Sequence, residues 1–192
     1  KKMLFVFNPK AGKGRIKMHL LDIVDIFSSH DYEVIIRATQ APKDAYEKAK
    51  EYADSVDLIV CSGGDGTLDE VVTGMMKRDR DKRDPIGYIP TGSSNDLARD
   101  LKIGHDIRPL MKKLLDGGTE HRMDLGCVTW NADGKTQKRH FLVSCGIGYD
   151  AAVCQEALDS PMKDALNKFG LGKLTYLGIG LKQMLTLQYC RA

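Results

Sequence analysis

Short apolar runs alternate with amphipathic segments through the first half of the chain. The apolar runs are brief and rich in β-branched residues, which predicts buried strands at residues 3–7, 34–36, 58–61 and 86–89. The segments between them repeat apolar side chains at the spacing of one helical face, which predicts helices over residues 16–27, 42–53 and 68–76. Pro42 fits the first turn of the second helix, where its missing N–H costs nothing. Alternating strands and helices predict an α/β fold in three layers, with helices on both faces of a parallel sheet.

The pattern changes after a predicted helix at residues 107–115. That helix ends at a Gly-Gly pair, and two β-like runs follow, at residues 122–130 and 135–145. The Asn-Ala-Asp-Gly sequence between the two runs is typical of a hairpin turn. We therefore predict an α/β domain over residues 1–120 and the N-terminal part of an incomplete, β-rich second domain over residues 121–192.

The strongest local signal is the run Cys61-Ser62-Gly63-Gly64-Asp65-Gly66-Thr67, which lies between a predicted strand and a predicted helix. Its three glycines allow a close backbone approach, so that successive N–H groups can converge on a phosphate at the start of the helix. The same residues in isolation also describe a tight turn in which Asp65 or Thr67 caps the helix.

Two further strand ends carry similar chemistry. Residues 8–15 combine two glycines with three cations, and residues 90–96 place hydroxyl, carboxamide and carboxylate groups before a helix. Alone, the first segment is also typical of a solvated basic turn and the second of a capping cluster. Because the carboxyl ends of parallel strands share one edge of the sheet, we expect all three loops to meet in one phosphate-binding site.

Composition narrows the classes of partner. The chain has 29 basic and 26 acidic residues, a net charge of +3, which is too small an excess to indicate nucleic acid. Its five cysteines are widely spaced without a CxxC pair, which indicates a reducing, cytoplasmic environment rather than a zinc site or a disulfide framework. The apolar runs are too short for a membrane span, so we expect a cytoplasmic protein with peripheral membrane association.

Two segments could bring the chain to a membrane surface. Residues 77–84 carry five basic and three acidic side chains, and these mixed signs favour a solvated loop over attraction to anionic lipid. A helix is expected to begin near Asp150. The apolar stretch at residues 174–187 is expected to pack in a core rather than to touch lipid.

The strand-end motifs resemble a known family. In order and spacing they resemble the catalytic domain of diacylglycerol and sphingoid-base lipid kinases: Asn8-Pro9-x-Ala11-Gly12, Gly63-Gly64-Asp65-Gly66-Thr67-x-x-Glu70 and Pro90-x-Gly92-Ser93-x-Asn95-Asp96-x-Ala98-Arg99. The resemblance covers about residues 3–180, since residues 123–126 and 145–150 look like the start of that family's β-rich second domain. It implies a fold shared with NAD kinases, with ATP and Mg²⁺ as cofactors.

The resemblance also implies site residues. Nucleotide contacts fall on the strand-end loops, at Asn8, Pro9, Lys10, Ala11, Gly12, Thr39, Gly63, Gly64, Asp65, Gly66, Thr67, Leu68, Asp69, Glu70 and Ser93. Asp65 is the candidate catalytic residue, as base or metal ligand, and Asp96 is a second metal candidate with helix capping as its alternative. In bacterial relatives the base instead lies in the second domain, beyond residue 192. Asp69 stands where the family usually has Asn, which adds a negative charge beside the expected phosphates.

We therefore expect an ATP- and Mg²⁺-dependent lipid kinase that phosphorylates a lipid hydroxyl, with diacylglycerol or a related lipid at the membrane surface as partner. No nucleic-acid partner is expected, and a homodimer is among the expected assemblies. One alternative is a soluble-metabolite kinase of the NAD-kinase type, which shares the GGDGT-like loop; residues 90–96 argue against it. The other alternative is a nucleotide-binding regulatory module without turnover, which the incomplete second domain motivates.

Overall fold

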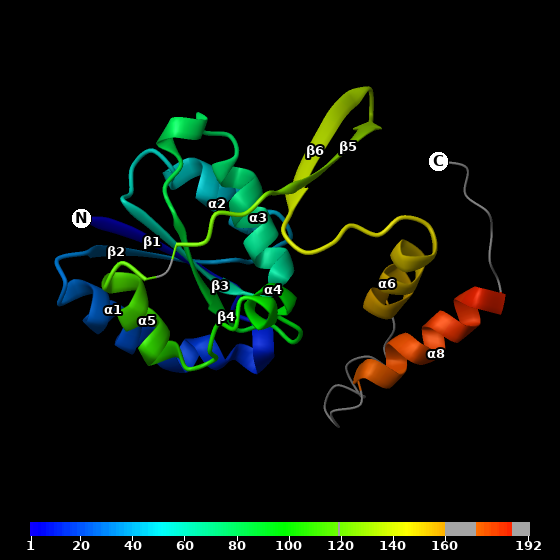
Figure 1. The fold of residues 1–192 in the computed structure, drawn as a ribbon, viewed down its shortest axis with the longest axis horizontal. Helices are drawn as coiled ribbons and strands as arrows, with labels where there is room; N and C mark the ends of the chain where they lie inside the picture. Colours follow the sequence, from blue (N-terminus) through cyan, green and yellow to red (C-terminus); the bar gives the residue numbers. More distant parts are fainter. Residues whose placement is uncertain (119, 160–171, 186–192) are drawn as a thin grey trace. The chain divides into compact units, whose positions relative to one another are not determined.

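A sheet of four parallel strands, in the order β2-β1-β3-β4, forms the centre of the first part of the chain (Figure 1). The computed structural model describes residues 1–118, 120–159 and 172–185. The strands are β1 (Lys2–Phe7), β2 (Glu33–Ala38), β3 (Leu58–Gly63) and β4 (Ile86–Pro90). All four predicted strands are confirmed. Because β3 and β4 run on to Gly63 and Pro90, the glycine-rich motif begins inside the sheet.

The central strand β1 is buried on both faces. Met3, Phe5 and Phe7 pack into one apolar cluster, whereas Leu4 and Val6 pack into a second cluster on the opposite face. Successive side chains of a strand point to opposite faces, so a strand covered on both sides has to be apolar throughout. This explains why β1 is a continuous apolar run rather than an alternating one.

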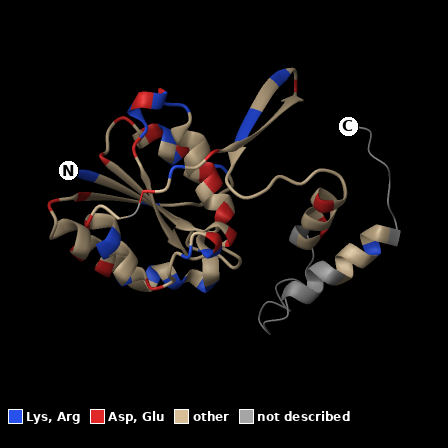
Figure 2. Ribbon diagram, viewed as in Figure 1, with Lys and Arg blue, Asp and Glu red and all other residues tan. Residues whose placement is uncertain are grey.

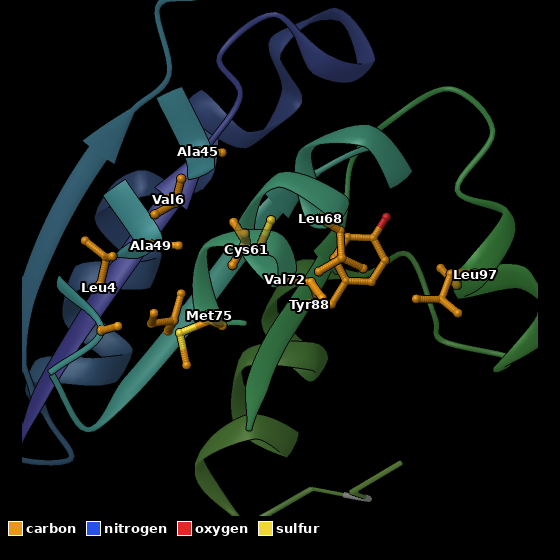
Figure 3. Packing of buried hydrophobic residues seen from close by; sticks show 14 residues of the cluster. Leu4, Val6, Ala45, Ala49, Cys61, Leu68, Val72, Met75, Tyr88 and Leu97 are labelled. Atoms are coloured by element: carbon orange, nitrogen blue, oxygen red, sulfur yellow. The ribbon is translucent and has the colours of Figure 1, made fainter. Parts of the chain in front are cut away.

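Helices cover both faces of the sheet, as the alternating pattern predicts. One layer contains η1 (Ala11–His19), α1 (Leu20–Ser28) and α5 (Ile107–Leu115). The other contains α2 (Asp44–Tyr52), α3 (Asp65–Met75) and the short α4 (Asp96–Asp100), and η2 (Arg80–Lys82) lies between α3 and β4. Figure 3 shows the second cluster, in which side chains of α2 and α3 pack against β1, β3 and β4. Within the residues that the structure describes, no helix has both the length and the apolar character needed to cross a membrane.

The first predicted helix differs from the observed structure at its N-terminal end. Residues 16–19 belong to the 3₁₀ segment η1, which begins before the predicted helix and contains three consecutive left-handed residues, Gly12, Lys13 and Gly14, with φ of 52°, 61° and 75°. The regular helix α1 begins only at Leu20.

The placement of Pro42 in the first turn of α2 is wrong. The helix begins at Asp44, after Lys43 in a left-handed conformation with φ of 73°. The Asp44 carboxylate accepts hydrogen bonds from the backbone N–H groups of Gln40 and Ala41, at 2.6 and 3.1 Å. These two bonds close a turn that contains Pro42, so the proline precedes the helix.

A two-stranded antiparallel hairpin follows α5, made of β5 (Gly126–Ala132) and β6 (Lys135–Phe141). Asp133 and Gly134 form its turn, with φ of 51° and 69°. Positive φ at both turn residues is the geometry that suits the twist of two hairpin strands. The hairpin is confirmed, although both strands are shorter than the β-like runs and two of the four predicted turn residues belong to β5.

The chain separates into two compact units, Lys1–Val143 and Ser144–Ala192, so the hairpin belongs to the first unit. The boundary expected near residue 120 concerns the complete protein and stays a prediction. In the second unit α6 (Tyr149–Asp159) and α8 (Gly172–Leu185) pack together, and the Tyr149 hydroxyl donates a hydrogen bond to the Gly180 carbonyl at 2.9 Å. The expected helix start near Asp150 is confirmed. Of the stretch expected to pack in a core, Ile179 is buried and Leu181 and Met184 are exposed; residues 186 and 187 lie outside the described residues.

Candidate nucleotide-binding site

All four strand ends meet at one edge of the sheet, and backbone hydrogen bonds continue just beyond the strands. The amide of Asn8 donates to the Ser62 carbonyl, the amide of Thr39 to the Phe7 carbonyl, and the amide of Thr91 to the Gly63 carbonyl, each at 2.9 Å. These bonds fix the starting point of each loop relative to its neighbours. The juxtaposition of the loops that the sequence predicts is thus present.

The two central strands send their chains to opposite faces. After β1 the chain enters the layer that contains α1, and after β3 it enters the layer that contains α3. In open α/β sheets such a divergence of neighbouring loops opens a crevice beyond the carboxyl ends of the strands, where ligands bind. By this rule we expect a ligand between residues 8–15 and residues 63–67, and we call this place the crevice.

Glycines let the three loops pack against one another. A Cβ at Gly12 would collide with the carbonyl oxygen of Thr91, and a Cβ at Gly92 would collide with the Cα of Gly64. The loops after β1 and β3 therefore both contact the loop after β4 through backbone atoms. No residue with a side chain fits at Gly12 or Gly92 without moving backbone.

The N-terminal end of α3 faces this crevice with free backbone donors. Gly64 is the N-cap residue, and its carbonyl accepts from the amides of Thr67 and Leu68 at 3.0 and 3.2 Å. The amides of Asp65 and Gly66 have no acceptor within the described part of the chain. A Cβ at Gly66 would meet open space. Free amides at a helix N-terminus favour an anion.

The carboxylate of Asp65 reaches across to the next loop. Its Oδ2 accepts from the amide of Asp96 at 3.0 Å, and its Oδ1 accepts from the amide of Leu97 at 3.2 Å. Asp65 thus caps α4 rather than its own helix, a role that the sequence pattern did not reveal. Each oxygen keeps a second lone pair that can face a ligand.

A buried network holds the loop after β4. Asn95 is buried in a left-handed conformation, and its carboxamide accepts from the Gly92 amide at 2.9 Å and donates to the Gly92 carbonyl at 2.8 Å. The hydroxyls of Ser62 and Thr91 lie 3.1 Å apart. Burial raises the pKa of the nearby Tyr88 phenol, which therefore stays protonated. Sequence reasoning placed Thr91 and Asn95 in a loop expected to join the phosphate-binding site, but it did not predict these hydrogen bonds and gave Tyr88 no site role.

The loop after β1 is shaped by Asn8 and exposes cations. The Asn8 carboxamide oxygen accepts from the amide of Lys10 at 2.9 Å, and the Asn8 carbonyl accepts from the amide of Ala11 at 3.2 Å. This is an Asx turn, which fixes the chain without regular structure. Lys10, Lys13 and Arg15 are exposed along the turn and η1, where Figure 2 shows a row of basic residues.

Two acidic residues of the motif have other partners. Glu70 accepts from the amide of Lys43 at 2.9 Å and so supports the start of α2. Asp69 accepts from the amide of Leu142, at the end of β6, at 3.0 Å. Burial raises the pKa of Asp69; the Leu142 hydrogen bond and Arg139 oppose that effect, and Asp65 adds to it. The expected proximity of Asp69 and Glu70 to a nucleotide stays a prediction.

The metal candidates Asp65 and Asp96 lie close together, since the Asp96 amide donates to the Asp65 carboxylate. The Asp96 carboxylate pairs with Arg99. No cluster of three or more His, Cys, Asp or Glu side chains that could hold a metal exists in the described residues. One or two carboxylates completed by water and substrate phosphates form the usual environment of Mg²⁺. The residues present therefore fit a magnesium ion that arrives with a nucleotide, and they do not form a complete cage.

Comparisons with known proteins agree with this geometry. A diacylglycerol kinase of Bacillus subtilis is 31% identical over 189 residues, which are 98% of this chain and 57% of the relative. A diacylglycerol kinase of Staphylococcus epidermidis is 30% identical over 164 residues, 85% of this chain and 48% of the relative. The chain thus spans about half the length of these curated relatives.

A solved structure and a family profile point the same way. The crystal structure of a diacylglycerol kinase from Bacillus anthracis matches with a TM-score of 0.53 and 30% identity, over 70% of this chain and 47% of that one. The profile of the diacylglycerol kinase catalytic domain matches residues 2–128, which include all the strand-end loops described above. The chain therefore belongs to the diacylglycerol kinase catalytic domain family.

Proposed function

We propose that the protein containing this chain is an ATP- and Mg²⁺-dependent lipid kinase that transfers the γ-phosphate of ATP to the hydroxyl of diacylglycerol or a related lipid. The names of its relatives support the acceptor, and the strand-end geometry supports the donor. The proposal extends beyond residues 1–192, because the relatives are about twice as long as the matched region.

The convergence of the three glycine-bearing loops beyond β1, β3 and β4 carries the proposal. Phosphoryl transfer needs positioning and charge neutralisation more than covalent chemistry. The free amides of Asp65 and Gly66 would bind phosphate oxygens at the N-terminal end of α3. Lys10, Lys13 and Arg15 would supply positive charge from the neighbouring loop.

Asp65 would hold the magnesium ion together with the phosphates, and Asp96 would be its second carboxylate. Bound there, the ion would neutralise charge on the transferred phosphoryl group. Asp65 also accepts two amide hydrogen bonds, which fix the orientation of its carboxylate. A base for the acceptor hydroxyl is either Asp65 itself or a residue of the second domain beyond residue 192.

The two alternatives make different predictions about the acceptor. A kinase of the NAD-kinase type would phosphorylate a soluble nucleotide, and a regulatory module would bind ATP without turnover. The chain covers about half the length of its relatives, so the experiment also has to test for ATP binding without turnover.

The deciding experiment supplies γ-labelled ATP and Mg²⁺ together with diacylglycerol in phospholipid vesicles, or with NAD in solution. Label should appear in a lipid product and not in NADP. Label in NADP would establish the soluble-metabolite alternative. Saturable ATP binding by calorimetry without either product would establish the binding module, and absence of ATP binding would refute all three.

A further inference from the structure

Helix α3 and strand β6 run antiparallel and contact each other in a regular register. Asp69 accepts from the Leu142 amide at 3.0 Å. Thr73, one turn further along α3, accepts from the His140 amide at 3.1 Å and donates to the His140 carbonyl at 3.3 Å. Four helical residues advance about 6 Å and two strand residues about 6.6 Å, so both elements progress at nearly the same rate. We call this contact the α3–β6 seam.

The next step of the register brings two cations together. Lys77 follows Thr73 by four residues, and its amide donates to the Gly74 carbonyl at 3.1 Å, so the helical path continues past the end of α3. Lys138 precedes His140 by two residues and lies on the same face of β6. The first two steps of the seam, at Asp69 and at Thr73, are hydrogen-bonded. The third step places the positive charges of Lys77 and Lys138 together.

A third cation, Arg83, joins them around the imidazole of His140. The pKa of His140 is lowered first by burial and then by the positive charges of Lys138, Arg83 and Lys77. Each of the three cations is therefore near enough to the ring to oppose its protonation. An imidazole among cations resists protonation and stays neutral. Its remaining N–H can still donate a hydrogen bond to an anion.

Two neighbouring cations of the same loop are paired with carboxylates, and these three are not. Arg78 pairs with Asp54 at 3.0 Å and with Asp84 at 2.8 Å, and Lys82 pairs with Asp79 at 3.3 Å. In the described part of the chain, no carboxylate lies within ion-pair distance of the cluster cations, namely Lys77, Arg83 and Lys138. Residues 77–84, which carry both signs of charge, thus leave uncompensated positive charge at the seam. Figure 2 shows the basic residues on this loop and on the hairpin.

The His140 ring itself has an unsatisfied polar atom. Its Nδ1 is buried and has no hydrogen-bond partner among the described residues. A buried polar nitrogen without a partner destabilises the fold, because its hydrogen bond to water is lost and not replaced. An oxyanion that accepts from Nδ1–H and lies among three cations would remove both this cost and the repulsion between like charges.

We propose that Lys77, Arg83, Lys138 and the His140 imidazole form a binding site for a phosphate-type oxyanion at the α3–β6 seam. The site is distinct from the glycine loops, because α3 has 11 residues and therefore separates its two ends by about 16 Å. The same chemistry suits inorganic phosphate and the headgroup of an anionic phospholipid. Binding there would tie the hairpin more firmly to the helix whose other end faces the nucleotide crevice.

The first experiment titrates inorganic phosphate into the full chain without nucleotide and follows the His140 imidazole by NMR. The resonance is identified by its absence from His140→Asn. A saturable shift, with a rise in the pKa of His140, is expected, and Lys138→Gln should weaken the apparent affinity by roughly tenfold. The matched control is Lys135→Gln, which removes the same charge from the same strand but on its opposite face and nearer the turn. The control should leave the affinity unchanged.

The second experiment measures co-sedimentation with phosphatidylglycerol vesicles and with phosphatidylcholine vesicles. We expect Lys138→Gln to weaken binding to the anionic vesicles and Lys135→Gln to leave it unchanged. This result supports the site and identifies a headgroup as a source of the anion, whether or not free phosphate also binds. Equal losses in the two variants would show diffuse attraction between charges and overturn the site. The absence of any His140 response to phosphate together with no binding to anionic vesicles would also overturn it. Neither readout involves kinase turnover, so the outcome is independent of the proposed function.

Discussion

The strand-end crevice and the α3–β6 seam share helix α3, and they are built in opposite ways. The crevice is made of backbone: its loops approach because Gly12 and Gly92 have no side chains. The seam is made of side chains: Asp69 and Thr73 bond the free edge of β6. A backbone-built site fails when atoms are added, and a side-chain-built contact fails when atoms are removed.

The largest effect is expected from adding one methyl group at the crevice. Gly12→Ala places a Cβ against the Thr91 carbonyl at a residue with φ of 52°. Overpacking and left-handed strain together should destabilise the fold by about 2–4 kcal/mol. Because the loops after β1 and β4 would separate, ATP binding should be lost. Urea unfolding and calorimetry with ATP measure the two effects.

Gly104→Ala is the matched control for that change. A Cβ at Gly104 would meet nothing within 4 Å, and this residue is not left-handed. Its unfolding free energy should therefore stay within about 0.5 kcal/mol of the parent chain. Normal ATP binding by Gly12→Ala would mean that contact between these loops is not needed for the nucleotide.

The second effect separates chemistry from capping at Asp65. Asp65→Asn keeps one acceptor oxygen for the α4 amides but removes the charge, so kinase activity should fall about a hundredfold to a thousandfold with little loss of stability. Asp65→Ala should lose the same activity and, in addition, about 1 kcal/mol of stability, since both capping bonds disappear. Steady-state kinetics on diacylglycerol vesicles and urea unfolding give the two numbers. Full turnover by Asp65→Asn would exclude a catalytic or metal-binding role.

The crevice could be predicted from the sequence, and the seam could not. Gly63-Gly64-Asp65-Gly66 follows a buried strand, and parallel strands place their carboxyl ends at one edge, so local pattern and topology together locate the site. Nothing local relates Thr73 to His140, which are 67 residues apart in the chain. The capping of α4 by Asp65 was missed for the same reason, since it joins residues 31 apart. The left-handed turn in η1 was missed because residues 12–14 precede Ile16, where the helical apolar spacing begins, so that spacing carries no information about them.

The third effect tests the seam by removing a single hydroxyl. Thr73→Val keeps the shape but loses both hydrogen bonds to His140, which should cost about 1–3 kcal/mol and speed hydrogen exchange at the His140 amide. Thr73→Ser retains the hydroxyl and should restore slow exchange. Exchange at the amide of Val60, in the centre of the sheet, provides the internal reference. If the His140 amide exchanged equally in the parent chain and in Thr73→Val, β6 would not be held by this residue.

The smallest effect is expected at Asp69, where the family resemblance and the seam lead to different expectations. Asp69→Asn keeps an acceptor for the Leu142 amide, so hydrogen exchange there should change little and kinase activity should be retained or rise.

The pKa of Asp69 is raised in the folded chain, so the neutral carboxyl is favoured by folding and the ionised one is not. The stability associated with the proton is present below the ordinary value of 3.8 and is lost as the pH rises through the higher folded value. Near neutral pH, Asp69→Asn should therefore match or exceed the parent chain by up to about 1 kcal/mol, and this difference should vanish in acid. Urea unfolding across that pH range measures the difference. A severe loss of activity in Asp69→Asn, with the hairpin still protected from exchange, would instead assign the carboxylate to the metal and so move Asp69 from the seam to the crevice.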